Sequence, residues 1–179
     1  MTVVSLSQIQ HLEAGARRIA ARIPDLPIEQ TLAVRMSILL GRELSLRMDH
    51  WLRPSGLSEV ELRVLMSIFS QAEEGTFPGE LCSALCQSPA NITRVTDALV
   101  VRGLITRAPS DEDRRRTELR VTAEGEALAR ELLPLICSFA RDLFAGFTPE
   151  ELEQLLGGLR RVFAALEGLR QDVPTEQGP

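Results

Sequence analysis

The sequence predicts a mainly α-helical fold of the α+β class, in which one small two-stranded sheet interrupts a series of helices. The prediction depends on one segment from Ser88 to Gly125, which reads SPANITRVTDALVVRGLITRAPSDEDRRRTELRVTAEG. Apolar residues at helical spacing open this segment, two short extended runs flank a charged turn, and a second helix pattern follows. Helix, hairpin and helix in this order form the second half of a winged helix-turn-helix.

Ser88 and Pro89 begin the first helix of this segment. The hydroxyl of Ser88 can accept a hydrogen bond from a backbone N–H of the first turn, and Pro89 occupies the first helical position, where its missing N–H costs nothing. Gly103 ends the helix. A buried face is predicted from the apolar residues at helical spacing, which are Ile92, Val95, Leu99 and Val100.

The predicted hairpin, or wing, follows directly. A strand is expected over 104–107, a charged turn over 108–116 and a returning strand over 117–121. Thr122 then stands where it can cap the next helix.

These features together resemble the MarR family of transcriptional regulators. The resemblance rests on a helix that opens Ser-Pro-Ala-Asn, on the phrase Arg-Gly-Leu-Ile after it, and on a wing that ends in Asp113-Arg114-Arg115 ahead of Leu119-x-Val121-Thr122-x-x-Gly125. The acidic residue that often opens the family's wing motif falls near Ser110 or Asp111 here. The similarity covers roughly residues 32–169 and leaves the first part of the chain as an extension.

Further helices are expected on both sides of this segment. A helix over 7–23 ends at a proline-containing break, and a helix over 28–52 would be about 37 Å long at 1.5 Å per residue. Capping boxes at Ser58–Glu61 and Thr148–Glu151 begin two more helices, a short helix covers 80–86, and another follows the wing to about residue 144. The predicted organisation is an N-terminal helical extension (1–27), a helical dimerisation region (28–54 and 123–170), a winged helix-turn-helix DNA-binding domain (55–122) and a flexible tail (171–179).

Composition excludes several function classes. The chain has 179 residues with 44% hydrophobic content, enough for one domain or two intimate ones. Aromatic residues make up only 4%, which disfavours stacking on single-stranded nucleic acid. Every basic residue is arginine, so P-loop and Schiff-base chemistry lack their lysine. The net charge of −5 leaves room for a local basic face, because phosphate attraction depends on where charges lie.

Targeting signals are not apparent in the sequence. No apolar run reaches the length of a membrane span, and the N-terminal residues lack the order of a signal peptide. Three cysteines fit a reducing compartment. We therefore expect a soluble, cytoplasmic protein with no membrane partner.

Polar and basic residues of the helix and the wing are the predicted contacts to double-stranded DNA. The second helix of a helix-turn-helix enters the major groove, and an arginine there can pair bidentately with guanine, which makes Arg94 the best candidate for reading a base edge. The alternative is that these residues only form solvated surface. The predicted DNA-binding residues are Ser88, Asn91, Thr93, Arg94, Thr96, Arg114, Arg115 and Arg116.

The wing arginines are expected in or near the minor groove, where narrow A·T-rich DNA attracts guanidinium groups. The resemblance implies that Asp113 orients a wing arginine and that Arg115 touches the DNA. The alternative is a solvated hairpin tip.

Leucine seams on the first long helix and on the last two helices exceed what the winged unit can cover. They could be internal core, but the resemblance implies a homodimer built through the terminal helices. Two recognition helices spaced by about one DNA turn would then read a palindromic operator.

The resemblance also implies a small aromatic or phenolic ligand at the junction between the dimerisation and DNA-binding parts. The candidate lining residues are Met48, His50, Trp51 and Arg53. A lone tryptophan more often packs in a core, and that reading is favoured for Trp51.

Catalytic and metal sites lack their parts. Cys82 and Cys86 are four residues apart, but zinc would need two further ligands, and His11 and His50 show no metal-site spacing. We expect no metal, no cofactor and no enzyme activity, since no nucleophile–base pair can be assembled. The expected function is a sequence-specific DNA-binding regulator, most often a repressor in this family. The alternative is a winged-helix module for protein–protein contact without specific DNA binding.

Overall fold

The computed structural model describes residues 4–23, 25–110 and 113–171. Parts of some predicted regions lie outside these residues: the start of the extension, Pro24, the turn residues Asp111 and Glu112, and all but the first residue of the predicted tail. The chain forms two compact units, residues 1–127 and residues 128–179.

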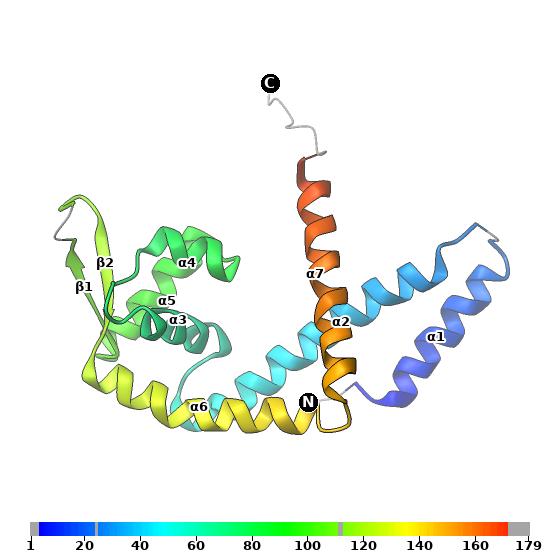
Figure 1. Cartoon of the computed structure of the whole chain (residues 1–179), viewed down its shortest axis with the longest axis horizontal. Helices are drawn as coiled ribbons and strands as arrows, with labels where there is room; N and C mark the ends of the chain where they lie inside the picture. Colours follow the sequence, from blue (N-terminus) through cyan, green and yellow to red (C-terminus); the bar gives the residue numbers. More distant parts are fainter. Residues whose placement is uncertain (1–3, 24, 111–112, 172–179) are drawn as a thin grey trace. The chain divides into compact units, whose positions relative to one another are not determined.

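The fold is mainly helical with one two-stranded sheet, as predicted (Figure 1). In chain order, the elements are α1 (Leu6–Ala20), α2 (Ile28–Leu52), the 3-10 turn η1 (Arg53–Ser55), α3 (Glu59–Ser70), α4 (Pro78–Leu85), α5 (Pro89–Val101), β1 (Ile105–Pro109), β2 (Thr117–Val121), α6 (Ala123–Leu143) and α7 (Pro149–Gln171).

Both predicted capping boxes are confirmed. The backbone N–H of Ser58 donates to the Glu61 carboxylate at 2.7 Å, and the N–H of Glu61 donates back to the Ser58 hydroxyl at 3.3 Å. Thr148 and Glu151 make the same exchange at 2.9 and 3.2 Å. Each pair satisfies backbone donors that a helix start leaves without an intrahelical partner.

Some element ends differ from the predicted ones. Helix α1 ends at Ala20 rather than at residue 23. Helix α4 begins earlier, because Pro78 fills the first helical position, and it ends one residue earlier, because Cys86 adopts a left-handed φ of 51°. Strand β1 continues to Pro109, which pairs with Thr117 across the hairpin.

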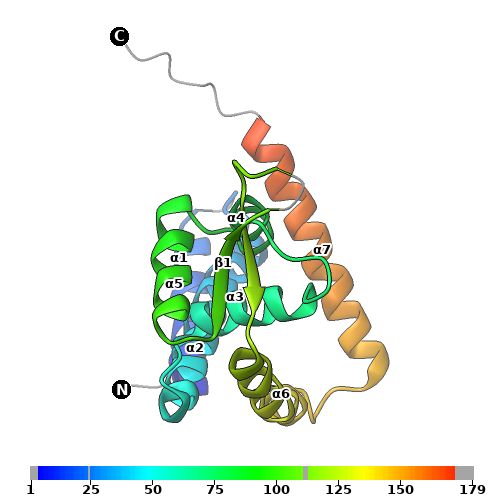
Figure 2. The same ribbon diagram turned by 90° about the vertical axis from the view of Figure 1, so that its left-hand side faces the viewer.

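The core of the first unit lies where α3, α5 and the wing meet (Figure 2). Burying one such aliphatic side chain contributes roughly 1.5–3 kcal/mol, so this cluster is the main stabilising feature of the unit. Its fully buried members include Val64, Leu65, Ile68, Ile92, Val95, Leu99, Ile105 and Leu119.

The hairpin is joined to the segment before α4. Thr76 and Leu119 exchange both backbone hydrogen bonds, at 3.0 and 2.8 Å. Thr76 therefore forms an isolated antiparallel β-bridge to β2. The side chain of Thr76 is buried. The middle of β2 is therefore hydrogen-bonded to the segment before α4.

The start of α6 packs tightly against the short segment between α5 and β1. The hydroxyl of Thr122 donates to the carbonyl of Gly103 at 2.7 Å and accepts from the N–H of Gly125 at 3.0 Å, which confirms the predicted cap. A Cβ on Gly125 would lie 2.0 Å from the carbonyl oxygen of Leu104. Only glycine allows the two backbones to approach so closely.

The second unit consists of the rest of α6 and of α7. The rings of Phe144 and Phe147 meet edge to face at the corner between the helices, with centroids 5.5 Å apart. Along α7 a row of large apolar side chains at near-heptad spacing remains exposed: Leu155, Leu159, Val162, Leu166 and Leu169. Within the described ranges, no helix is both long and apolar enough to cross a membrane.

Candidate nucleic-acid interface

Helices α4 and α5 form a helix-turn-helix with a tightly ordered turn. The left-handed conformation of Cys86 ends α4, and the backbone N–H of Gln87 donates to the carbonyl of Cys82 at 3.1 Å. The hydroxyl of Ser88 then accepts from the N–H of Asn91 at 3.2 Å, as the sequence predicts for an N-cap. Ser88 therefore has a defined structural role at the start of α5.

The polar face of α5 carries Thr93 and Arg94 as exposed residues and Asn91 as a half-buried one. The guanidinium of Arg94 donates to the Asn91 side-chain oxygen from its Nε at 3.3 Å and from a terminal nitrogen at 2.9 Å. The Thr93 hydroxyl donates to the carbonyl of Pro89 at 2.9 Å. Arg94 is the longest of these side chains, and it retains unused donors.

Thr96 does not belong to this face, and its prediction as a DNA contact is wrong. Only 1% of Thr96 is exposed. Its hydroxyl donates to the carbonyl of Ile92 at 2.8 Å and accepts from the guanidinium of Arg107. Thr96 lies four residues after Ile92 and three before Leu99, which places it on the buried side of the helix.

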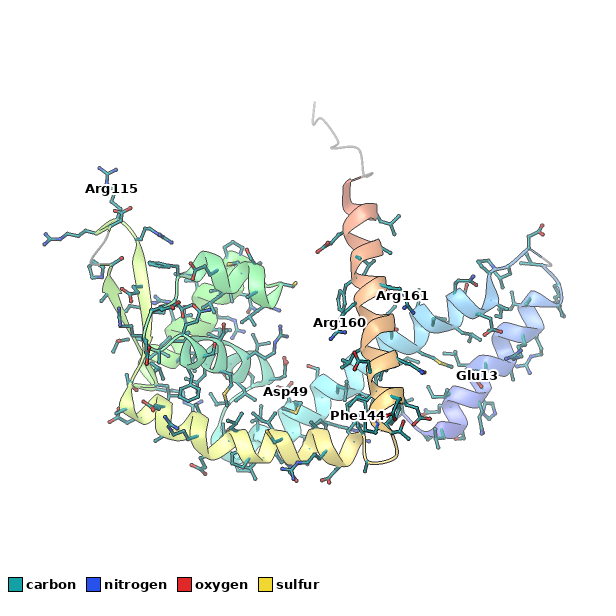
Figure 3. All side chains as sticks on the ribbon, in the orientation of Figure 1. Glu13, Asp49, Arg115, Phe144, Arg160 and Arg161 are labelled. Carbon is teal, nitrogen blue, oxygen red and sulfur yellow. The ribbon has the colours of Figure 1, made fainter. Side chains whose placement is uncertain are left out.

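The tip of the wing holds Arg114 and Arg115, both exposed. The carboxylate of Asp113 accepts from the backbone N–H of Arg115 at 3.0 Å, and the carbonyl of Asp113 accepts from the N–H of Arg116 at 2.8 Å. Asp113 thus shapes the turn through the backbone. Figure 3 shows Arg115 at the end of the wing, with its side chain pointing away from the ribbon.

Comparison with known proteins identifies the family that has this arrangement. The model of the MarR family matches residues 57–117. The transcriptional repressor MprA of Escherichia coli is 31% identical over 153 residues, covering 86% of this chain and 87% of that protein. The chain belongs to the MarR family.

Other relatives and solved structures agree with this placement. The repressor YetL of Bacillus subtilis is 27% identical, covering 71% of this chain and 76% of its own. MarR of E. coli, as a cysteine-to-serine mutant complexed with operator DNA, has a TM-score of 0.68 at 25% identity over 77% of this chain and 98% of that one. The MepR–DNA complex of S. aureus has a TM-score of 0.70 at 17% identity, over 74% of this chain and 96% of that one, and shows the shared fold.

The third wing arginine differs from the other two in this MarR-family chain. The guanidinium carbon of Arg116 lies 3.7 Å from the centroid of the Phe77 ring, at the start of α4. Residues 77–80, Arg116 and Thr117 line a shallow groove there. A stacked guanidinium keeps its charge but gives up some freedom to reach a phosphate. The predicted DNA contact of Arg116 therefore has a competing intramolecular partner.

Sequence reasoning missed three polar residues that support α5. Arg107, on β1, donates to the Asp97 carboxylate at 2.5 Å and to the carbonyl of Thr93 at 3.4 Å. Arg102 donates to the carbonyls of Ser55 and Gly56 at 2.8 and 2.7 Å. The third is Gln87, in the turn before α5. In the sequence, the only sign of such a role is that a polar residue lies beside a buried helix face.

The candidate ligand residues lie at the end of α2 and in η1. Met48 is half-buried, whereas His50, Trp51 and Arg53 are exposed. At helical spacing Met48 and Trp51 share one side of α2, and His50 points to the opposite side. One small ligand could therefore contact Met48 and Trp51 together more easily than all four residues.

Metal-ligating side chains do not gather at this site. Across the part of the chain that the structure describes, no group of three or more His, Cys, Asp and Glu residues is placed to hold a metal ion. Cys82 is half-buried, and Cys86 is exposed with its thiol donating to the carbonyl of Ser83 at 3.9 Å. Cys86 therefore lies at the surface, at the end of α4.

Proposed function

We propose that this protein is a transcriptional repressor that binds a palindromic operator in double-stranded DNA as a homodimer. The observation that carries the proposal is that one compact unit presents exposed arginines on both α5 and the wing. They are Arg94 on α5, and Arg114 and Arg115 on the wing. A recognition helix and an adjacent basic hairpin can engage a major groove and the neighbouring minor groove at the same time.

The contacts divide into reading and positioning. Ser88 caps α5, and Asn91, Thr93 and Arg94 lie in its first half, the part of a recognition helix that faces base edges. Of these predicted contacts, Arg94 keeps the free donors that could read a base edge. Arg114 and Arg115 would contact phosphates or the minor groove and so set the register without reading sequence directly. Arg116 contributes less, since it stacks on Phe77.

A dimer follows from the apolar surface and from the family. MarR-family proteins are dimeric. Val162, Phe163 and Leu169 on α7 are 57%, 67% and 63% exposed in the single chain, and a second subunit would cover such a row. Two copies of α5 separated by about one helical turn of DNA would match a palindrome.

Release of the operator by a small aromatic or phenolic acid completes the proposal. The supporting feature is the pair Met48 and Trp51 on one side of α2, at the end that leads into the DNA-binding unit. Such a ligand lowers DNA affinity only if it binds more tightly to a dimer whose helix spacing does not fit the groove.

Fluorescence anisotropy with labelled duplex from the protein's own upstream intergenic region tests the DNA-binding function. Wild type, Arg115→Ala and the charge-matched control Arg22→Ala are titrated at several salt concentrations. We expect tight, salt-sensitive binding by wild type and by the control. Arg115→Ala should bind about tenfold more weakly, with a salt slope smaller by about one for each lost phosphate contact.

Two outcomes contradict the proposal. Absence of binding to any duplex at low salt, by a dimer with native circular dichroism, would favour a protein-contact module. An equal loss in Arg115→Ala and Arg22→Ala would show that the attraction is diffuse and does not involve the wing.

A further inference from the structure

Three side chains form a directed hydrogen-bond relay from the turn into the exposed face of α5. The Gln87 amide nitrogen donates to the carbonyl of Leu85 at 3.4 Å, which leaves the Gln87 oxygen facing α5. That oxygen accepts from the Asn91 amide nitrogen at 2.5 Å. The Asn91 oxygen in turn accepts from Arg94 at 2.9 and 3.3 Å.

The relay runs from fixed structure to solvent. Gln87 and Asn91 are half-buried, and Arg94 is exposed. The backbone of Gln87 is itself anchored, because its N–H donates to the carbonyl of Cys82 at 3.1 Å. The carbonyl of Leu85 also accepts from Arg63 at 3.0 Å, so the first acceptor of the relay is held from α3 as well.

The relay decides which edge of the Arg94 guanidinium is free. A guanidinium has five N–H donors in a planar fork. Asn91 occupies the side edge, formed by Nε and one terminal nitrogen. The end edge, with its parallel pair of terminal N–H groups, is left to pair with two acceptors in one plane. In the major groove, guanine offers such a pair in O6 and N7.

The same contacts remove Asn91 as a reader of adenine. An asparagine that pairs with adenine needs both its amide nitrogen and its oxygen. Here the oxygen already accepts two hydrogen bonds from Arg94, which use both of its lone pairs, and one of the two amide N–H groups donates to Gln87. Gln87 is engaged at both ends of its amide as well.

We infer that Gln87 and Asn91 are positioning residues that hold Arg94 end-on to read one guanine in each operator half-site. This inference rests on the proposed function. The preference for guanine at that base pair then depends on Gln87, Asn91 and Arg94 together. Gln87 contributes to it without contacting DNA itself. Arg94 alone, without its support, would keep its attraction for phosphate but lose orientation, since a long side chain has many rotamers to lose on binding.

Selection from a duplex library with randomised half-sites tests the inference. Full-length wild type, Arg94→Ala, Gln87→Ala and Asn91→Ala are compared, with Gln10→Ala on α1 as the chemically matched control. The selected duplex is then measured by anisotropy with guanine or 7-deazaguanine at the preferred position. The analogue replaces the N7 acceptor with C–H and leaves the rest of the base pair in place.

Wild type and Gln10→Ala should select guanine at one position of each half-site and lose about tenfold in affinity on 7-deazaguanine. Arg94→Ala should lose this preference entirely. Gln87→Ala should lose most of it at that position alone, with unchanged salt slope and unchanged affinity for a scrambled duplex. Asn91→Ala should lose the same guanine preference. Circular dichroism and gel filtration establish that each variant is a folded dimer, and Asn91→Ala serves if Gln87→Ala does not fold.

Results that contradict the inference can be told apart from results that contradict the proposed function. A guanine preference that survives Arg94→Ala, or that survives both relay variants, overturns the inference. An equal loss of affinity for every duplex in Gln87→Ala would make it a structural residue only. If wild type binds no duplex at all, the proposed function fails, whereas binding without guanine preference overturns only the relay.

Discussion

The guanidinium of Arg107 donates to the hydroxyl of Thr96, and this contact joins the wing to the recognition helix. The same guanidinium also reaches the Asp97 carboxylate and the carbonyl of Thr93. One side chain of β1 therefore contacts acceptors on one full turn of α5. These contacts restrain the position of the wing relative to α5, which both need if they are to engage one DNA site together.

Replacing Arg107 by alanine should weaken DNA binding although Arg107 makes no predicted DNA contact. The Arg107 and Asp97 side chains are 32% and 55% exposed, so solvent screening limits the loss of unfolding free energy to about 1 kcal/mol. Urea denaturation measures that loss, and anisotropy measures DNA affinity. Asp97→Asn keeps an acceptor and should lose less of both. A binding constant unchanged in Arg107→Ala would rule out this role.

Thr96→Val should lower stability and leave sequence preference intact. Valine matches the shape of threonine but removes a buried hydroxyl that donates to Ile92 and accepts from Arg107. The expected loss is about 1–2 kcal/mol of unfolding free energy, because Arg107 also loses an acceptor. Thermal denaturation checks the loss, and Thr96→Ser, which keeps the hydroxyl, is the control. A changed base preference in the valine variant would mean that Thr96 contacts DNA after all.

Arg102 should stabilise the connection between α2 and α3. It follows α5 directly, and its guanidinium bridges the carbonyls of Ser55 and Gly56. Arg102→Ala should cost about 1 kcal/mol in urea denaturation. Arg102→Lys should recover little of this, because an ammonium lacks the planar fork that spans two carbonyls. Full recovery in the lysine variant would show that charge alone matters at this position.

Gly125→Ala should be among the most damaging single substitutions in the first unit. The new Cβ would lie 2.0 Å from the carbonyl oxygen of Leu104, so the start of α6 must move. We expect a loss of about 3 kcal/mol or more of unfolding free energy. Gly41→Ala, in α2 with nothing within 4 Å of its new Cβ, is the control and should be neutral or stabilising by up to about 1 kcal/mol. Equal effects of the two changes would contradict the close approach at Gly125.

Local chemistry made much of this fold predictable from the sequence. The cap at Ser88, the boxes at Ser58–Glu61 and Thr148–Glu151 and the cap at Thr122 each involve residues within a few positions of one another. Their interactions form whenever the local helix forms. Apolar spacing added which helix faces are buried, and the order of elements gave the winged helix-turn-helix.

Only the tertiary structure decided which polar residues of that unit are free to meet DNA. The spacing of Thr96 from Ile92 and Leu99 indicates the buried side of α5, but only the structure shows that its hydroxyl accepts from Arg107, eleven positions later on β1. Arg116 reads like its two neighbours, yet the ring of Phe77 lies beneath it. Such pairings join residues on different elements. They depend on how those elements pack, and spacing along one helix carries no information about that packing.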